Sequence, residues 1–362
     1  MTGLAGGALV GLKVVDFSTL LPGPLAGLML AAAGAKVWKI ERPGGEDMRR
    51  MGAAPDGISL VWRMLNAGKE ILELDLKQAA DRTRLEPLLA EADVVIEGFR
   101  PGVMDRLGLG PAALAARFPR LICCSITGYG QTGPLADRAG HDLNYLAESG
   151  ILALGQQGSG GPVVPPLLAA DIAGGAYPAV INILLALEQR RRTGRGVRLD
   201  IAMSRNLLPF AWWAIAEALA TGGWPGSGDA LLTGGSPRYQ VYRTRDGRWL
   251  AAAPLEERFW EAFCAAIELP EPLRRSTDAR TVRDEVAARI LARTAAEWER
   301  RLAPLDACCS VVATLAEALG RPPFKDELPT GTATRPTLPL PIAPALRAEV
   351  ERPCVEADAA DI

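Results

Sequence analysis

The feature that most constrains the fold of this chain is an apolar strand, a helix and a second strand that follow one another near the amino terminus. Residues 12–17 form a short apolar run, residues 24–33 have helical periodicity, and residues 36–41 have the pattern of a strand. This βαβ order requires a parallel sheet. Further strands are predicted at residues 93–96 and 121–125, and the carboxyl ends of such strands line the ligand crevice of doubly wound sheets.

The second half of the chain has a different pattern. A long apolar helix is predicted over residues 172–192, followed by a strand that contains Asp200 and by an aromatic helix around Trp212. The glycine-rich segment 221–229 is typical of a linker, and the turn Arg245-Asp246-Gly247 indicates a hairpin. We therefore predict an α/β protein with a large Rossmann-like domain over residues 1–220, a small α+β domain over 230–325, and a proline-rich strap over 326–362 that returns to the large domain.

Composition argues against several classes of partner. Apolar residues make up 49% of the chain and charged residues 23%, which are the proportions of a globular protein. The 40 Lys and Arg residues are balanced by 42 Asp and Glu residues, so no basic surface for nucleic acid is indicated. The six cysteines form no C-x-x-C pair, which predicts free thiols and no metal site.

Neither a membrane span nor a secretory signal is predicted. The apolar stretches 20–35 and 172–187 are interrupted by glycine and proline, and both are shorter than the roughly 20 apolar residues of a spanning helix. Residues 1–12 lack a basic region and a small-residue cleavage site. A cytoplasmic location is therefore expected.

The opening βαβ unit also raises the hypothesis of a dinucleotide-dependent dehydrogenase. Glu41 ends the second strand, where an acidic residue would meet a ribose. The glycine motif is absent, however, because residues 21–27 read Leu-Pro-Gly-Pro-Leu-Ala-Gly. The prolines remove backbone N–H donors that a pyrophosphate needs, so the sequence disfavours a nicotinamide or flavin site.

Three titratable residues are candidates for catalysis, and each also has a structural explanation. His141 is the only histidine in the chain, so chemistry that needs an imidazole near neutral pH must use it. Asp171 is expected at the start of the long helix, where it would act as an N-cap, although a helix start also keeps a carboxylate ionised and available as a base. Glu256 is expected in the first helical turn, where acidic residues are common.

Basic residues follow several of the predicted strands. Arg42, Lys77, Arg100 and Arg106 could each be solvated surface residues, which is the usual role of such side chains. Together at one edge of a sheet they would attract a phosphorylated ligand.

Several short motifs follow one another in a fixed order along the chain. They are Gly11-Leu12-Lys13-Val14-Val15-Asp16-Phe17-Ser18, Lys39-Ile40-Glu41-Arg42-Pro43-Gly44-Gly45, Leu65-Asn66-Ala67-Gly68-Lys69, Leu74-Asp75-Leu76-Lys77, Glu97-Gly98-Phe99-Arg100-Pro101-Gly102-Val103 and Gly128-Tyr129-Gly130-Gln131-Thr132-Gly133-Pro134. With these motifs the chain resembles the family III coenzyme A (CoA) transferases and, within them, the α-methylacyl-CoA racemases. The resemblance extends from Gly11 to about Ala318.

The resemblance implies a role for each of the three candidates. Asp171 matches the family's aspartate, which carries the acyl group in transferases and acts as an acid/base in racemases. His141 matches the racemase histidine, and Glu256 matches a glutamate that supports this histidine. The residues implied to contact the CoA moiety and the thioester are Arg42, Leu74, Asp75, Leu76, Lys77, Gly98, Phe99, Arg100, Arg106, Gly140, Asp142, Leu143, Asn144 and Tyr145.

Two reactions and one binding function follow from this resemblance. The first is racemisation of a 2-methylacyl-CoA thioester by two bases, with no cofactor apart from the CoA of the substrate and no metal. The second is transfer of CoA between carboxylic acids through an aspartyl anhydride, which His141 disfavours. A non-catalytic acyl-CoA binding protein would lack the bases, which this chain retains.

The resemblance also implies an interlocked homodimer. The chain departs from the family pattern after Ala318, where Gly320-Arg321-Pro322-Pro323-Phe324 replaces a stretch that commonly contains histidine. The acyl chain of the substrate is therefore not indicated.

Overall fold

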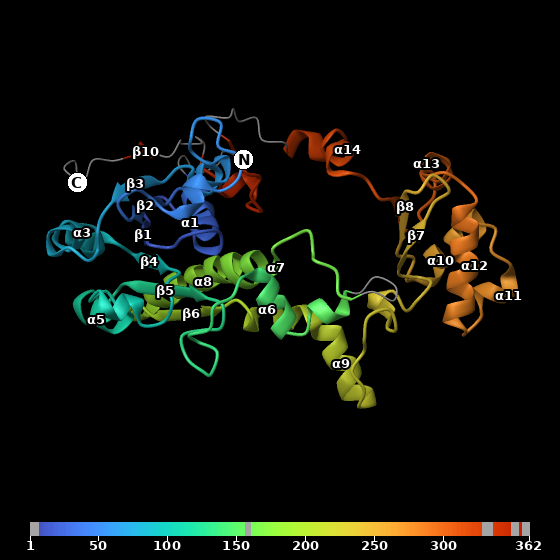
Figure 1. Cartoon of the computed structure of the whole chain (residues 1–362), viewed down its shortest axis with the longest axis horizontal. Helices are drawn as coiled ribbons and strands as arrows, with labels where there is room; N and C mark the ends of the chain where they lie inside the picture. Colours follow the sequence, from blue (N-terminus) through green and yellow to red (C-terminus); the bar gives the residue numbers. More distant parts are fainter. Residues whose placement is uncertain (1–6, 156–160, 328–335, 349–354, 357–362) are drawn as a thin grey trace. The chain divides into compact units, whose positions relative to one another are not determined.

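The strands predicted near the amino terminus lie in one parallel sheet in the computed structural model (Figure 1). The structure describes residues 7–155, 161–327, 336–348 and the backbone of 355–356, and within these residues the sheet has seven strands in the order β10-β3-β2-β1-β4-β5-β6. This is the strand order of a Rossmann-like sheet with one added edge strand. The strands are β1 Lys13–Asp16, β2 Lys36–Glu41, β3 Glu70–Glu73, β4 Val94–Glu97, β5 Ile122–Thr127, β6 Arg198–Ala202 and β10 Val355–Glu356.

Helices cover both faces of this sheet. Buried side chains of α3, Leu85, Leu88 and Leu89, pack with sheet residues such as Val15 and Val95 on one face. On the other face α1 contacts β1 and β2, and α8 contacts β5 and β6. The helices are α1 Pro22–Ala32, α2 Leu60–Asn66, α3 Ala79–Glu91, α4 Val103–Arg106, α5 Pro111–Arg117, α6 Asp142–Glu148, α7 Ala169–Asp171 and α8 Tyr177–Thr193.

The chain divides into two compact units. Unit 1 contains the parallel sheet and comprises the described residues within 7–149, 165–209 and 336–356, whereas unit 2 comprises those within 150–164 and 210–327. Both units are therefore discontinuous in sequence, whereas the predicted domains are contiguous. The carboxyl-terminal segment contacts unit 1, because the Ala348 N–H donates to the Ala32 carbonyl (2.8 Å) and β10 pairs with β3.

Unit 2 is built around a three-stranded antiparallel sheet in the order β7-β8-β9. Its core contains the fully buried rings of Trp260, Phe263 and Trp298. The predicted hairpin is confirmed as β7 and β8. The elements are α9 Trp212–Thr221, β7 Gln240–Arg243, β8 Trp249–Ala252, α10 Glu257–Ala266, α11 Glu271–Arg274, α12 Ala279–Leu291, α13 Ala295–Leu302, β9 Cys309–Val311 and α14 Leu315–Leu319.

The helix predicted over 172–192 begins earlier and is not interrupted. It runs from Ala169 to Thr193 and includes a π-helical segment, Ile172–Ala176. Gly174 is required there, because a Cβ atom would lie 2.5 Å from the Met203 carbonyl oxygen. By length and composition alone this helix could cross a membrane, but its Ala179 and Ile183 are fully buried within unit 1. The absence of a membrane span stays a prediction.

A buried group of charges lies at the carboxyl ends of β1 and β2. The Lys69 ammonium, which is inaccessible to solvent, donates to Asp16 Oδ2 (2.9 Å), to the Pro24 carbonyl (2.9 Å) and to Asn66 Oδ1 (3.1 Å). Lys39 is equally buried and lies 3.4 Å from Glu46. Burial alone would raise the pKa of Asp16, but the charges of Lys69 and Lys39 hold it below its usual value.

Replacing Lys69 with methionine should lower the free energy of unfolding by about 3–5 kcal/mol, because the Asp16 carboxylate would remain buried without its main partner. Urea unfolding followed by circular dichroism measures this loss. Lys13→Met, which removes an exposed pair with Glu91, is the control and should have little effect. A loss in Lys69→Met no larger than in the control would contradict the role assigned to this pair.

Candidate active site

A cavity in unit 1 lies at the carboxyl ends of β1, β2, β3 and β4. Its volume is about 400 Å³. Open α/β sheets bind ligands at this edge, at the point where the strand order reverses. In this sheet the reversal is at β1, which lies between β2 and β4. The lining residues are Phe17, Thr19, Leu20, Ile40, Glu41, Arg42, Glu46, Asp47, Leu74, Asp75, Leu76, Lys77, Phe99, Val103 and Leu107.

The cavity brings together six of the residues predicted to contact CoA: Arg42, Leu74, Asp75, Leu76, Lys77 and Phe99. Five of them come from the loops after β2 and β3, and Phe99 follows β4. The loop after β1, which includes Thr19 and Leu20, was not predicted as part of the site. Its position after the first strand could have indicated it.

Two cations, Arg42 and Lys77, line this cavity. Arg42 is 62% exposed and donates to Asp47 Oδ1 (2.7 Å) and to the Gly45 carbonyl (3.1 Å). The acidic lining residue Glu46 accepts from the Leu20 N–H and lies beside Lys39, so its charge is directed into the protein. The lining therefore offers an anionic ligand two cations, Arg42 and Lys77, beside the carboxylates of Asp47 and Asp75.

Both carboxylate oxygens of Glu41 already accept hydrogen bonds from protein groups. Its Oε2 accepts from Arg49 Nε (2.7 Å) and its Oε1 from the Trp62 indole (2.9 Å), and the residue is 4% exposed. Helix α1 begins directly at Pro22, with Pro24 in its first turn. The absence of a dinucleotide cofactor stays a prediction.

Arg100 and Arg106 are not among the residues that line the cavity. Both side chains are exposed, Arg100 in the loop after β4 and Arg106 at the end of α4. The positive charge of Arg100 acts on the Tyr145 hydroxyl, where it opposes a rise in the pKa. Gly98 lies close to Ser18, whose Cβ would be 3.7 Å from a Cβ at that position.

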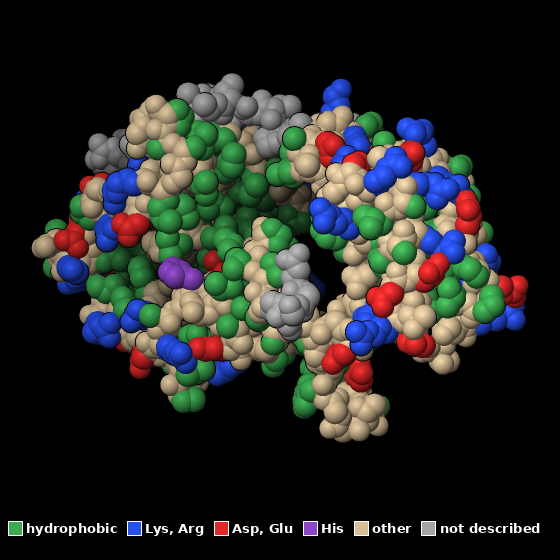
Figure 2. Space-filling view, turned by 45° about the vertical axis from the view of Figure 1, so that its right-hand side comes forward, with side chains coloured by type: hydrophobic (Ala, Val, Ile, Leu, Met, Phe, Trp, Pro, Cys, Tyr) green, Lys and Arg blue, Asp and Glu red, His purple; other side chains and the backbone are tan. Residues whose placement is uncertain are grey.

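A second cluster in unit 1 contains two of the predicted catalytic residues. His141 is the N-cap residue of α6, and its exposed imidazole is the purple side chain in Figure 2. Asp171 ends the short helix α7 and is partly buried. Between them, the Asp142 carboxylate accepts a hydrogen bond from the Asp171 N–H (2.9 Å) and is 4% exposed.

The pKa of Asp171 is raised to about 6, first by burial and then by the negative charge of Asp142, while His141 opposes the rise. An acid of this strength exchanges its proton readily near neutral pH. The prediction that Asp171 is the N-cap residue is wrong, because Leu168 holds that position and α7 starts at Ala169.

The loop after β5 fixes the start of α6. Gly128 allows the Tyr145 ring to pack against the backbone, since a Cβ there would lie 2.4 Å from the ring. The Tyr145 hydroxyl donates to the Gly140 carbonyl, and its ring meets that of Tyr129 edge-on at 5.2 Å between centroids. Asn144 Oδ1 accepts from the His141 N–H (3.0 Å). Leu143 and Asn144 are exposed on α6.

Glu256, the third predicted catalytic residue, lies in unit 2. It is the N-cap residue of α10, and its side chain is exposed and makes no capping hydrogen bond. Its support of His141 therefore stays a prediction. Within the described residues, no group of three or more His, Cys, Asp or Glu side chains could hold a metal ion.

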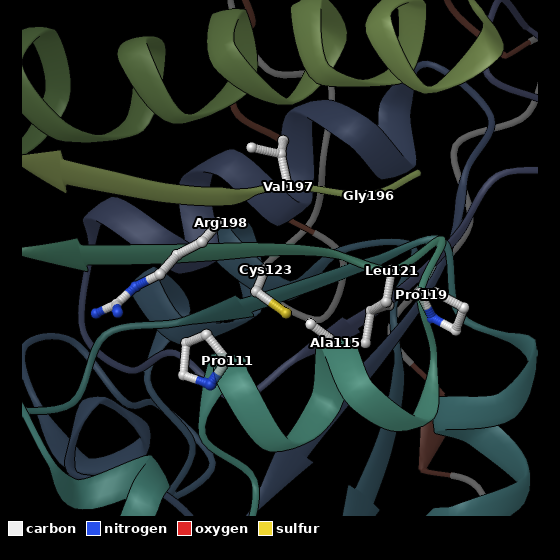
Figure 3. Close-up of a pocket in the computed structure, with 8 residues that line it drawn as sticks. All are labelled: Pro111, Ala115, Pro119, Leu121, Cys123, Gly196, Val197 and Arg198. Carbon is white, nitrogen blue, oxygen red and sulfur yellow. The ribbon is translucent and has the colours of Figure 1, made fainter. Parts of the chain in front are cut away.

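A smaller pocket of about 130 Å³ lies between α5 and the strands β5 and β6 (Figure 3). The Cys123 thiol faces it, and burial raises the pKa of this thiol to about 12. The thiol is therefore protonated at neutral pH and is a poor nucleophile. Cys354 lies outside the described residues, and the other five cysteines are free thiols.

Solved structures and curated proteins similar to this chain carry related names. A CAIB/BAIF family protein from Brucella suis superposes with a TM-score of 0.83 at 28% identity, covering 98% of each chain. Human alpha-methylacyl-CoA racemase is 36% identical over 86% of this chain and 79% of its own length. Acetyl-CoA:oxalate CoA-transferase from Acetobacter aceti is also 36% identical, over 72% of this chain and 67% of its own length.

The family match covers nearly the whole chain, since residues 9–350 fit the family described as CoA-transferase family III. Relatives with a racemase name and relatives with a transferase name are both close, so the family alone does not decide between the two reactions. The cavity beside the strand ends and the His141–Asp171 cluster both lie within the matched residues. This chain belongs to CoA-transferase family III.

Proposed function

We propose that this protein is a racemase that inverts the α-carbon of a 2-methylacyl-CoA thioester. The observation that carries the proposal is the cluster of His141, Asp142 and Asp171 in unit 1, because it places a histidine and an aspartate close enough for their charges to interact. The likeness to alpha-methylacyl-CoA racemase along 86% of the chain supports it.

The proposed reaction proceeds through a planar enolate. One base removes the α-proton from one face, and the conjugate acid of the other returns a proton to the opposite face. A single base would tend to return the proton to the face that it left. We assign His141 to one face and Asp171 to the other, with Glu256 supporting the imidazole, and no metal or redox cofactor is required. Backbone N–H groups at the start of α6 are candidates to stabilise the enolate oxygen.

The CoA moiety is assigned to the cavity at the strand ends. Its phosphates would meet Arg42 and Lys77, while Leu74, Leu76 and Phe99 provide apolar walls. Arg106 is absent from the lining, so its predicted contact depends on the ligand reaching beyond the cavity.

The second candidate function is CoA transfer between carboxylic acids. It is supported by the 36% identity to acetyl-CoA:oxalate CoA-transferase. In this reaction the Asp171 carboxylate would attack the thioester carbon and expel the CoA thiolate, which leaves an aspartyl anhydride. His141 would then have no required role as a base.

The two bases predict a separable pattern of deuterium exchange. In deuterium oxide, His141→Ala should abolish inversion while Asp171 still introduces deuterium into one enantiomer of a 2-methylacyl-CoA. Asp171→Ala should label the other enantiomer. Both rates should fall by about 10²–10⁴-fold, as is typical for the loss of an acid or base. Mass spectrometry after chiral separation measures the label.

The racemase proposal is contradicted if the parent enzyme transfers CoA to a free carboxylate, and this activity disappears in Asp171→Ala but survives in His141→Ala. The control is Asp278→Asn, which alters a capping residue of α12 in unit 2 and should retain the exchange pattern.

Charge reversal in the cavity should weaken CoA binding. Arg42→Glu and Lys77→Glu each replace a lining cation by an anion, so the affinity should fall strongly and become less sensitive to salt. Isothermal titration at two salt concentrations measures both effects. Arg275→Glu reverses a cation that is 77% exposed on unit 2 and serves as the control. Parent-like CoA affinity in both cavity variants would show that the ligand binds elsewhere.

We further propose a homodimer. The family resemblance motivates it, and α8 exposes a row of apolar side chains, Ile181, Leu184 and Leu185, on a chain whose net charge is only −2. Light scattering at micromolar concentration should give about twice the 38.4 kDa of one chain. A mass near that of one chain would exclude the dimer.

A further inference from the structure

Asp142 lies between the two proposed bases without a part in the reaction described above. Its side chain is buried at 4% exposure, and its Oδ1 accepts the Asp171 N–H at 2.9 Å. A buried carboxylate is costly unless it is hydrogen-bonded, so this position requires an explanation.

The hydrogen bond links the first turns of two helices. Asp142 is the first residue of α6 and directly follows His141, and Asp171 lies in the first turn of the long helix that begins with α7. The N–H that it binds belongs to the first turn of a helix, where such groups have no partner within the helix. One side chain therefore fixes the backbone of one base relative to the backbone of the other.

The charge of Asp142 also acts on Asp171. Helix α7 packs against α6 and continues into the π segment. The titratable groups of α6 are Asp142, Tyr145 and Glu148, and His141 is its N-cap residue. Glu148 is paired with Arg138 (2.9 Å).

The π segment is packed in turn by α1, α8 and β6. Helix α1 carries no titratable side chain. In α8, Tyr177 is nearest along the chain, and the charged residues begin only at Glu188. In β6, Asp200 accepts from the Gln131 N–H (3.1 Å) and Arg198 donates to Gln131 (3.2 Å). Among the described residues of these elements, Asp142 is therefore the carboxylate whose charge acts on Asp171.

We infer that Asp142 is a positioning residue, whose oxygen fixes the backbone of Asp171 and whose negative charge makes the Asp171 carboxylate a stronger base. A higher pKa helps Asp171 to remove a proton from a weakly acidic carbon, because proton transfer is most efficient when the pKa of the base lies near the working pH. The role of Asp171 in proton transfer rests on the proposed function. The interaction between the Asp142 and Asp171 carboxylates is independent of it.

Asp142→Asn separates the two contributions, because it keeps an oxygen acceptor for the Asp171 N–H and removes the charge. In full-length protein labelled with ¹³C at aspartate carboxyls, Asp171 is assigned by the signal lost in Asp171→Asn. Its titration midpoint, about 6 in the parent, should fall in Asp142→Asn by on the order of one pH unit. The acid limb of α-deuteration should move to lower pH by the same amount.

Asp142→Ala removes both the charge and the acceptor. Its Asp171 midpoint should fall as well, and the exchange rate at the optimum should drop by about tenfold or more, because the base is no longer held in place. The rate at the optimum in Asp142→Asn should stay closer to that of the parent. Circular dichroism verifies that each variant is folded, and Asp278→Asn, a capping change in unit 2, should leave the Asp171 midpoint where it was.

The two proposals fail in different ways. A parent enzyme that exchanges no α-proton overturns the racemase function, while the carboxyl titration still decides the role of Asp142. An unchanged Asp171 midpoint in both Asp142 variants overturns the inference, whatever reaction the enzyme catalyses.

Discussion

The Lys69 ammonium holds together the strand ends beside the cavity of unit 1. An ammonium group has three donors, and here each meets one acceptor: Asp16 at the end of β1, the Pro24 carbonyl in α1, and Asn66 at the end of α2. Because a buried charge without partners is so unfavourable, these three elements are held at one place. Asp16 in turn accepts from the N–H of Ser18, the residue just before the lining residues Thr19 and Leu20.

Burial and neighbouring charges also set the pKa of Asp171, one of the proposed bases, although the outcome differs from that of Asp16. Asp16 is buried beside two ammonium groups, which keep it ionised. Asp171 is partly buried beside another carboxylate, and its pKa rises to about 6. Unit 1 thus holds one aspartate that neighbouring cations keep ionised and another that can gain and lose a proton near neutral pH, and the difference lies in the sign of the neighbouring charge.

Local periodicity predicted the elements that repeat a simple pattern, such as β2 over Lys36–Glu41 and the hairpin of β7 and β8. Local periodicity did not predict the elements whose structure depends on tertiary packing. Strand β3, with only Ile71 and Leu72 between two glutamates, is too short to stand out in the sequence. The long helix was predicted to begin at residue 172, but it begins at Ala169 and includes Asp171 in its first turn. Its π-helical segment, in which Gly174 and Gly175 lie close to Met203, was not predicted.

The family motifs identified the surroundings of the site, but not how its charges interact. Asp142 follows His141 in sequence, whereas its hydrogen-bond partner Asp171 is 29 residues away, and no sequence pattern joins the two. That contact bears on the choice between reactions. In CoA transfer, Asp171 must leave again from an anhydride, and a carboxylate leaves more easily when it is a weaker base. In racemisation it must take a proton from carbon, and a stronger base does so more easily. A neighbouring anion that strengthens Asp171 as a base would therefore aid the proposed proton transfer and the attack on a thioester alike, and would hinder only the departure from an anhydride.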